Sequence, residues 1–258
     1  EHTKLVFDMN MPVKEALTDV LRLVSVGSKR FLTNKVDRAV TGLVAQQQCC
    51  GPLQLPLSNV AVVAQSHFGK TGCATAIGEQ PIKMVVDPVA GARMTVGEAL
   101  TNLMWARVED LDQVKCSANW MWAPKLDGEG AALYDAAKAM RDVMIALGIA
   151  VDGGKDSLSM ATMVDGKTVK SPRQLVVSLY GAMPDITRVV TPDIKEPGST
   201  LLFINLSKDY NRLGGSSFAQ TQGQVGYIVP DLRDPWLIRA CFQTVQKLID
   251  KNLILAGH

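Results

Sequence analysis

The sequence lacks the features that mark several large classes of protein. None of its apolar runs reaches the roughly 18 residues that suggest a membrane-spanning helix. Its 27 basic and 25 acidic residues leave a formal net charge of +2, so the bulk positive field typical of nucleic-acid-binding domains is missing. The first four residues do not show the charged-then-apolar pattern of a secretory signal. These absences predict a protein with neither a membrane nor a nucleic acid as its partner.

Cysteine is also too sparse to organise the chain. The five cysteines are odd in number and show no C-x-x-C spacing, which argues against a disulfide framework and gives a zinc site no support. The adjacent pair Cys49 and Cys50 could be reactive, but free cysteine is among the most buried residue types, so burial is the favoured interpretation. We therefore expect reduced thiols in a cytoplasmic protein.

What the chain does have is enough apolar residues for a substantial core. With 258 residues, 47% of them hydrophobic, it suits one large domain or one and a half smaller ones. Apolar periodicity predicts a mixture of helices and strands rather than a strict alternation, which favours an α+β fold with a mixed sheet and helices on one face. Helices are expected over residues 13–24, 92–110, 130–147 and 235–251, and strands over 60–64, 72–77, 82–86, 175–182 and 200–206.

Proline punctuation divides the chain. Pro184, Pro192 and Pro197 fall between two patterned stretches, so a domain boundary is predicted near residue 186, giving domains of residues 1–185 and 186–258. The last residues, 253–258, form a short apolar strand or turn with nothing after it to pack against. The chain is therefore expected to be a piece of a longer protein.

Three polar segments could carry chemistry. Lys29 follows a glycine and a small hydroxyl residue, so backbone N–H groups and an ammonium could converge on a phosphate there. The segment lacks the first glycine of a phosphate-binding loop, and a turn with a solvated lysine is the alternative. Residues 152–160 contain two adjacent glycines before Lys155, which fits either a polar-ligand site or a tight turn between a helix and a strand.

The third segment pairs Glu98 with Asn102. Their i,i+4 spacing places both side chains on one face of the predicted helix. Two oxygen-bearing groups could help to hold a hard cation such as Mg²⁺, although phosphate oxygens or other segments would have to complete its shell. A solvated polar face is the alternative interpretation.

Taken in series, several segments resemble the large, single-chain phosphoribosylformylglycinamidine synthases. The resemblance covers nearly the whole chain in the same order. It is carried by residues 28–38, 42–48, 98–102, 119–122 and 153–160. It implies an aminoimidazole ribonucleotide synthetase-like A domain, the second in that family's synthetase region, followed by the start of the second B domain.

The resemblance also implies a reaction and its cofactors. In that family ATP phosphorylates the formamide oxygen of formylglycinamide ribonucleotide, and ammonia from glutamine displaces the phosphate to give the amidine. Positioning and Mg²⁺ neutralisation of phosphate charge would carry most of the catalysis. The implied cofactors are ATP or ADP and Mg²⁺. The implied partners are the first A–B pair, the glutaminase domain and the substrate.

Site residues follow from the resemblance position by position. Lys29 and Ser58 match residues that contact the nucleotide, and Glu98 and Asn102 match Mg²⁺ ligands of a site that is commonly auxiliary. Asn59 stands where the family usually has Asp, which removes one negative charge beside the metal. None of the five cysteines matches the glutaminase nucleophile, so no residue here is expected to be catalytic and the chain alone is expected to be inactive. The alternative is a non-catalytic nucleotide-binding or assembly module.

Overall fold

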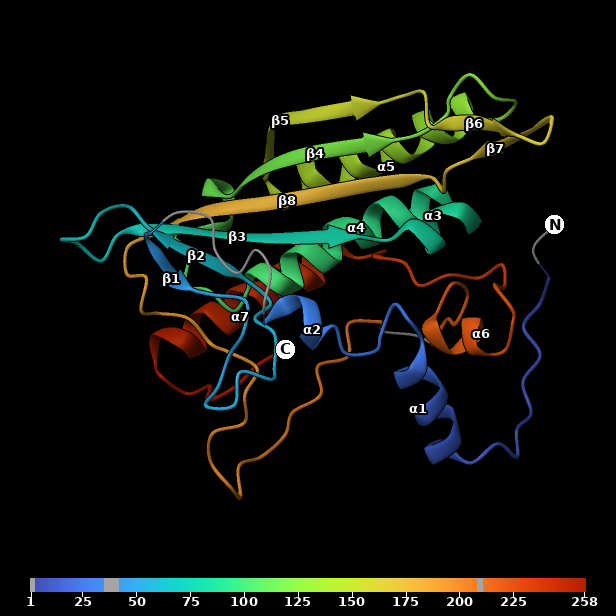
Figure 1. Cartoon of the computed structure of the whole chain (residues 1–258). Helices are drawn as coiled ribbons and strands as arrows, with labels where there is room; N and C mark the ends of the chain where they lie inside the picture. The colour runs from blue at the N-terminus through green and yellow to red at the C-terminus, as the bar shows by residue number, and fades with distance from the viewer. Residues whose placement is uncertain (1–2, 35–41, 208–210) are drawn as a thin grey trace.

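A six-stranded mixed sheet forms the centre of the molecule. The computed structural model describes residues 3–34, 42–207 and 211–258; residues 35–38 of the resemblance lie outside these ranges. The sheet order is β1-β2-β3-β8-β4-β5, and Figure 1 shows it as a twisted layer. The strands are β1 (Val44–Gln46), β2 (Ala61–Ala64), β3 (Gly72–Glu79), β4 (Lys115–Met121), β5 (Ala150–Ser157) and β8 (Gln174–Met183). All neighbouring pairs are antiparallel except β4 and β5, which are parallel.

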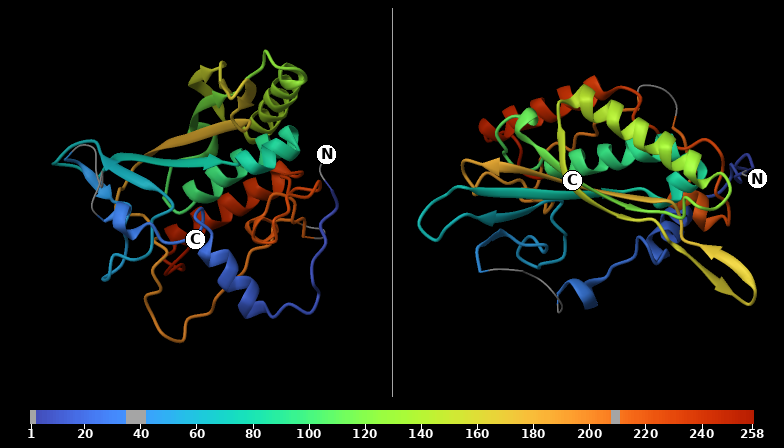
Figure 2. Two further views of the ribbon diagram at one scale, coloured as in Figure 1. Left: turned by 45° about the vertical axis from the view of Figure 1, so that its right-hand side comes forward. Right: turned by 90° about the horizontal axis from the view of Figure 1, so that it is seen from above.

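Three long helices cover one face of this sheet. They are α4 (Pro88–Leu103), α5 (Glu129–Leu147) and α7 (Pro235–Asp250). Seen from above, all three lie on the same side of the strands (Figure 2). The main hydrophobic core joins side chains of the sheet, α4, α5 and α7, including the fully buried Trp122 and Phe242. The predicted α+β class with helices on one face is confirmed.

Alternation along β8 explains why the helices take one face. Leu175, Val177 and Leu179 are fully buried under the helices, while Val176 and Ser178 between them remain partly exposed on the other face. A strand with period-two burial has one core face and one open face. The central strand therefore fixes which side of the sheet the helices cover.

Helix α5 connects the two parallel strands. It follows β4, and its left-handed Gly148, with φ of 75°, ends the helix before β5 begins at Ala150. A glycine at this position avoids the steric cost that a side chain would meet at positive φ. The predicted stop at Gly148 is confirmed.

Close contact between α4 and β3 depends on Gly78. A Cβ atom built there would lie 2.2 Å from the Thr95 carbonyl oxygen and 2.5 Å from the Ala99 nitrogen. Real Cβ atoms do not approach backbone atoms so closely, so only glycine allows the helix to rest on the strand here. This approach brings polar side chains of α4 within reach of the end of β3.

The remaining elements are short. A β-hairpin of β6 (Ala161–Val164) and β7 (Lys167–Lys170) projects from the end of β5 (Figure 1). Helix α1 (Val13–Arg22) has no buried residue. Helix α6 (Ser217–Thr221) packs beside α1. The others are α2 (Arg30–Thr33), α3 (Pro81–Val86) and a 3-10 turn over Leu111–Gln113.

Two of the predicted strands, and the turn that was one alternative for residues 152–160, were wrong. Residues 82–86 form helix α3 rather than a strand, because Pro81 starts a helical turn that buries Met84 against Gly91. The glycines at 153 and 154 lie inside strand β5 rather than in a turn; a Cβ at Gly154 would lie 2.2 Å from the Ala118 carbonyl. Residues 200–206 form no strand, since no neighbouring strand pairs with them, and Phe203 is 90% exposed.

The predicted boundary near residue 186 stays a prediction. Residues on both of its sides contribute to one core, because Ile238, Phe242 and Val245 of α7 belong to the same cluster as the sheet. The Gln246 side chain also donates to the Met104 and Ala106 carbonyls and accepts from the Val108 nitrogen. Helix α7 is thus a structural part of the sheet-and-helix layer.

Candidate functional site

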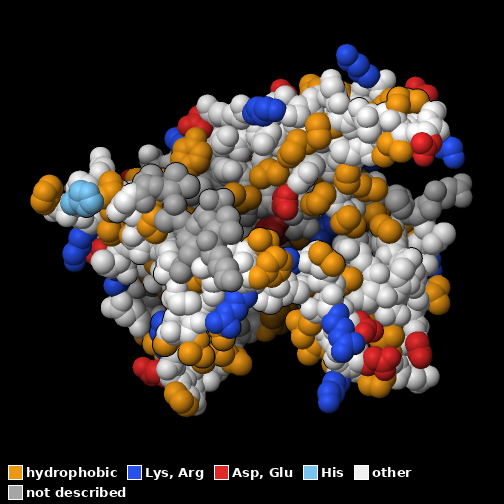
Figure 3. Space-filling model, viewed as in Figure 1, with side chains coloured by type: hydrophobic (Ala, Val, Ile, Leu, Met, Phe, Trp, Pro, Cys, Tyr) orange, Lys and Arg blue, Asp and Glu red, His pale blue; other side chains and the backbone are white. Residues whose placement is uncertain are grey.

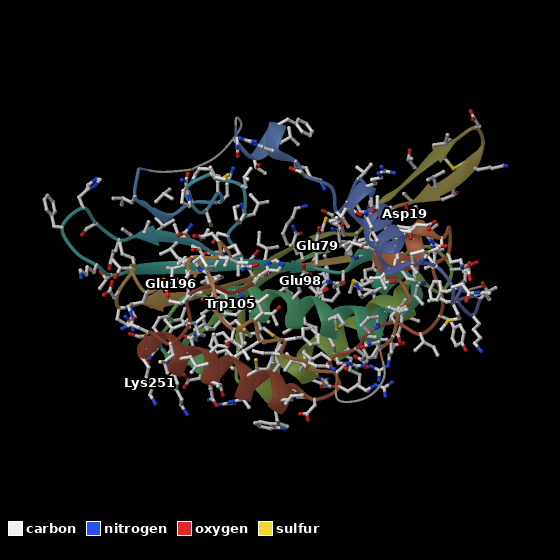
Figure 4. The ribbon with its side chains drawn as sticks, turned by 90° about the horizontal axis from the view of Figure 1, so that it is seen from below. Asp19, Glu79, Glu98, Trp105, Glu196 and Lys251 are labelled. Atoms are coloured by element: carbon white, nitrogen blue, oxygen red, sulfur yellow. The ribbon has the colours of Figure 1, made fainter. Side chains whose placement is uncertain are left out.

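Glu98 and Asn102 meet the backbone of β3 at one edge of the sheet. The Glu98 Oε2 atom accepts from the Glu79 nitrogen at 2.8 Å and from Gln80 Nε2 at 2.7 Å. One helical turn further on, Asn102 Nδ2 donates to the Ile77 carbonyl at 2.9 Å. The i,i+4 prediction is confirmed in its geometry, since both side chains lie on the face of α4 that meets β3. Figure 4 shows Glu79 beside Glu98.

These hydrogen bonds have a structural cause. Strand β2 pairs with β3 from Gly72 to Thr75, so β3 continues beyond the start of β2 with its edge uncovered. Unpaired backbone groups at a sheet edge need partners, and the two α4 side chains supply them. Because Nδ2 of Asn102 and Oε2 of Glu98 are used in this way, Oδ1 of Asn102 and Oε1 of Glu98 are the atoms left for a further ligand.

A lysine stands beside this carboxylate. Lys83 Nζ donates to Gln80 Oε1 at 2.5 Å, and Gln80 in turn donates to Glu98. Burial lowers the pKa of Lys83, while the negative charge of Glu98 opposes that change. No local pattern indicated Lys83, because its place beside Glu98 depends on how α3 and α4 pack.

Ser58 and Asn59 lie where the chain enters β2. The Ser58 hydroxyl donates to the Val60 carbonyl at 2.6 Å, and the Ser58 nitrogen donates to the Gln48 carbonyl at 2.8 Å. The Asn59 side chain contacts the distant end of the chain instead: Nδ2 donates to the Gly257 carbonyl at 3.3 Å and Oδ1 lies 2.8 Å from His258 Nδ1. Since β2 is antiparallel to β3, Asn59 precedes β2 at the end where β3 runs on toward Ile77.

Lys29 stands at the N-cap position of the short helix α2, and its side chain makes no capping hydrogen bond. Its Nζ atom donates to the Gly27 carbonyl at 2.7 Å. In Figure 4 helix α2 lies on the opposite side of the sheet from α4, apart from the labelled Glu98. Among the described residues, the hydrogen bonds and ion pairs include none between Lys29 and the other four predicted site residues. The structure therefore brings Glu98 and Asn102 together, and places Lys29 on a separate element.

The oxygen set fits a magnesium ion that takes its other ligands from phosphates. It offers one carboxylate and neutral amide oxygens, and Mg²⁺ is commonly held by one or two carboxylates together with substrate phosphates. In the described part of the chain, no three His, Cys, Asp or Glu side chains are grouped so that they could hold a metal ion. Cavities of about 450 and 200 Å³ lie elsewhere, beside Tyr180 and beside Tyr227.

Residues 28–182 match the domain family described as the FGAR-AT PurM_N-like domain. The chain belongs to this family. The matched residues take in strands β1 to β5, all but the last residue of β8, and helices α4 and α5, and they include all five predicted site residues.

Relatives extend the similarity over almost the whole length. The chain is 59% identical to a probable phosphoribosylformylglycinamidine synthase of Arabidopsis thaliana, whose name assigns it to chloroplasts or mitochondria, over 95% of this chain and 18% of that protein. It is 57% identical to phosphoribosylformylglycinamidine synthase of Homo sapiens, over 96% of this chain and 19% of that protein. This FGAR-AT PurM_N-like chain thus spans about a fifth of the relatives it matches, as the resemblance implied.

Solved structures are similar over part of the chain. PurLQS from Thermotoga maritima matches 65% of this chain and 25% of its own, with 20% identity and a TM-score of 0.49. PurL of T. maritima complexed with ADP matches 74% and 29%, with 17% identity and a TM-score of 0.49. Within residues 3–34, 42–207 and 211–258, no helix combines the length and the apolar character that crossing a membrane requires.

Proposed function

We propose that this chain contributes a Mg–nucleotide site to an ATP- and glutamine-dependent ligase that converts formylglycinamide ribonucleotide to the amidine in purine biosynthesis. The observation that carries the proposal is the pairing of Glu98 with Asn102 at the uncovered edge of β3, within a chain of the FGAR-AT PurM_N-like family. The site is auxiliary in this proposal, and the chain alone has no turnover.

Each predicted residue has a distinct part in this site. Glu98 and Asn102 would hold the magnesium ion through Oε1 and Oδ1, since their other polar atoms are bonded to β3 and Gln80. Asn59 would add a neutral oxygen, and Ser58 would contact the nucleotide. Lys29 would donate to a phosphate, which requires its ammonium to leave the Gly27 carbonyl. The bound ion would supply neutralisation of phosphate charge.

The proposal extends to partners outside this chain. In the complete ligase the first A–B pair and the glutaminase domain would supply the substrate site and the ammonia, in the cytoplasm. Within this chain, residues 1–185 would form the A-type domain and residues 186–258 the start of the B-type domain. The open face of the sheet would meet the other half of a pseudo-dimer. Figure 3 shows hydrophobic side chains on the side of the molecule that faces the viewer. Ile77 of β3 is 53% exposed.

Calorimetric titration with Mg-ADP tests the nucleotide site. Glu98→Gln should weaken Mg-ADP binding about ten-fold or more, because it removes the one charged ligand. Glu109→Gln is the matched control, since this exposed carboxylate lies outside the site. Lys29→Ala should weaken binding about five-fold, as expected for the loss of one charge-assisted hydrogen bond. Equal affinities for wild type and Glu98→Gln would refute the magnesium role.

A second measurement tests the statement that the chain alone is inactive. ATP hydrolysis should not depend on formylglycinamide ribonucleotide when only this chain is present. Substrate-dependent turnover by the chain would show that it contains a complete active site. The proposal that the catalytic residues lie in other domains would then be wrong.

The second candidate is a non-catalytic nucleotide-binding or assembly module. It is favoured by Asn59, which offers the site no charge, and by the uncovered sheet face. Under this alternative, Mg-ADP would bind without any contribution to turnover in the complete ligase. The Glu98→Gln variant of the complete ligase decides between the two candidates. If the variant no longer binds the nucleotide at this site but its rate is unchanged, the non-catalytic module is supported.

A further inference from the structure

The Asn59 amide is held at both of its ends by the last two residues of the chain. Its Nδ2 atom donates to the Gly257 carbonyl at 3.3 Å, and its Oδ1 atom lies 2.8 Å from His258 Nδ1. An asparagine amide can otherwise turn over and exchange its oxygen for its nitrogen, because the two atoms have nearly the same shape. The Gly257 carbonyl can only accept a hydrogen bond, so it requires the Nδ2 end of the amide on its side.

The chain end is itself fixed in place. The Gly257 nitrogen donates to the Thr191 carbonyl at 3.2 Å. A Cβ atom at Gly257 would lie 2.1 to 2.5 Å from the ring carbons of Trp105, so the glycine rests directly on the indole. Trp105 is 8% exposed and follows the end of α4, the helix that carries Glu98 and Asn102 (Figure 4). Gly257 is therefore anchored just beyond the end of the helix that carries the other two predicted metal ligands.

The partners of Asn59 assign a donor role to Nδ1 of His258. Because Nδ2 of Asn59 is the donor to a carbonyl, Oδ1 must be the acceptor in its contact with the imidazole. In this arrangement Nδ1 of His258 carries a proton and donates it to Oδ1 of Asn59. A carbonyl oxygen has two lone pairs, so Oδ1 of Asn59 keeps one for a cation.

We infer that His258 is a positioning residue for Asn59: with the Gly257 carbonyl, it turns the amide so that Oδ1, and not Nδ2, faces the Mg–nucleotide site. This inference rests on the proposed function. It gives the end of the chain a part in a site whose other residues lie in the FGAR-AT PurM_N-like region. Mutation of a partner that orients a metal ligand typically costs about 10- to 100-fold in metal affinity.

A double-mutant cycle tests the inference through metal affinity. His258→Ala should weaken the Mg²⁺ dependence of ADP binding about ten-fold and leave metal-free ADP binding unchanged. His258→Asn keeps a donor at the δ position and should restore most of the affinity. In an Asn59→Asp background the same His258→Ala change should cost less than about two-fold, because the two oxygens of a carboxylate are equivalent. Equal losses in both backgrounds would overturn the inference.

A readout without nucleotide separates this inference from the function on which it rests. In the chain labelled with ¹⁵N at asparagine, the Asn59 side-chain amide signals should shift on His258→Ala and return toward wild type with His258→Asn. Unchanged signals would show that His258 does not orient the amide. If wild-type chain bound no Mg-ADP, the proposed function would fail, while the amide signals would still decide the contact between His258 and Asn59.

Discussion

Two glutamates on neighbouring helices show how differently one fold can use the same side chain. Glu129, the first residue of α5, is 2% exposed, and its carboxylate is paired with Arg173 at 2.9 Å and with Lys170. Glu98, within α4, is partly exposed and accepts from a backbone nitrogen and a neutral amide. Glu129 has its charge balanced by two bonded cations, whereas the groups bonded to Glu98 among the described residues are neutral.

The partners of each carboxylate decide whether it can also bind a ligand. The hydrogen bonds from Arg173, and then those from Lys170, hold the pKa of Glu129 at about 2. These contacts join the start of α5 to Lys170 at the end of β7 and to Arg173 just before β8. Arg173 also donates to the Val85 carbonyl of α3. A carboxylate used so fully stabilises the fold and has no capacity left for a metal ion. Glu98 has that capacity because its partners are neutral.

The largest expected effect comes from removing the balanced carboxylate. Glu129→Ala should lower the free energy of unfolding by about 4 kcal/mol, because it leaves Arg173 without its partner in a poorly solvated place. Urea denaturation measures this loss. Glu98→Ala is the matched control and should cost about 1 kcal/mol, the value of ordinary hydrogen bonds. Similar losses in the free energy of unfolding of the two variants would show that Glu129 and Glu98 do not differ in their contribution to stability.

The pH dependence of the free energy of unfolding should report the ionisation of Glu129. The pKa of Glu129 is about 2 in the folded chain and about 4.3 when unfolded, so the unfolded state binds more protons between these values and stability falls as the pH is lowered through them. This one group should account for about 3 kcal/mol between pH 5 and pH 2. Urea titrations of wild type and Glu129→Gln isolate it, since the other carboxylates are common to both. Parallel pH profiles would contradict the prediction.

The place of Glu98 can be tested by moving its helix. Gly78→Ala should destabilise the chain by about 2 kcal/mol, since the added methyl group would push α4 away from β3. It should also disrupt the hydrogen bond to the Glu79 nitrogen, which amide hydrogen exchange at Glu79 would report. Gly153→Ala is the control, because its Cβ would have no neighbour nearer than 3.8 Å. Unchanged protection at Glu79 would show that close helix contact is unnecessary.

The smallest expected change in stability concerns a third carboxylate, that of Asp152. Asp152 on β5 accepts a hydrogen bond from the Tyr180 hydroxyl, which raises the pKa of Tyr180 to about 12. Asp152→Asn should lower that pKa toward its ordinary value near 10 and change stability by less than about 0.5 kcal/mol. Alkaline absorbance titration measures the tyrosine, with Asp156→Asn as the control. An unchanged titration would mean that this exposed pair does not form in solution.

Local patterns predicted the parts of the fold that depend on neighbours in the chain. The apolar stripe of α5, its end at Gly148 and the buried alternation of β8 all follow from periods of 3.6 and 2. Residues 152–155 did not follow, because glycines normally punctuate loops and nothing local shows that β4 pairs with them. Residues 200–206 have the composition of a strand, yet a strand also needs a partner.

The candidate site divides in the same way. The spacing of Glu98 and Asn102 predicted their common face, since four residues make about one helical turn. Their contacts with Ile77 and Glu79 required the end of β2 to leave β3 uncovered, which is a property of sheet register. The contact of Asn59 with His258 spans 199 residues of sequence, so no local pattern could indicate it.

The strand order has a consequence for the way this protein is made. β8 lies between β3 and β4, although it follows both of them in the chain. Until β8 has been synthesised, β3 and β4 lack the central strand that pairs with both of them. Long-range pairing of this kind is slow, and incomplete sheets expose edges that aggregate. Chaperone binding to the nascent chain should therefore matter most until Met183, the last residue of β8, has left the exit tunnel.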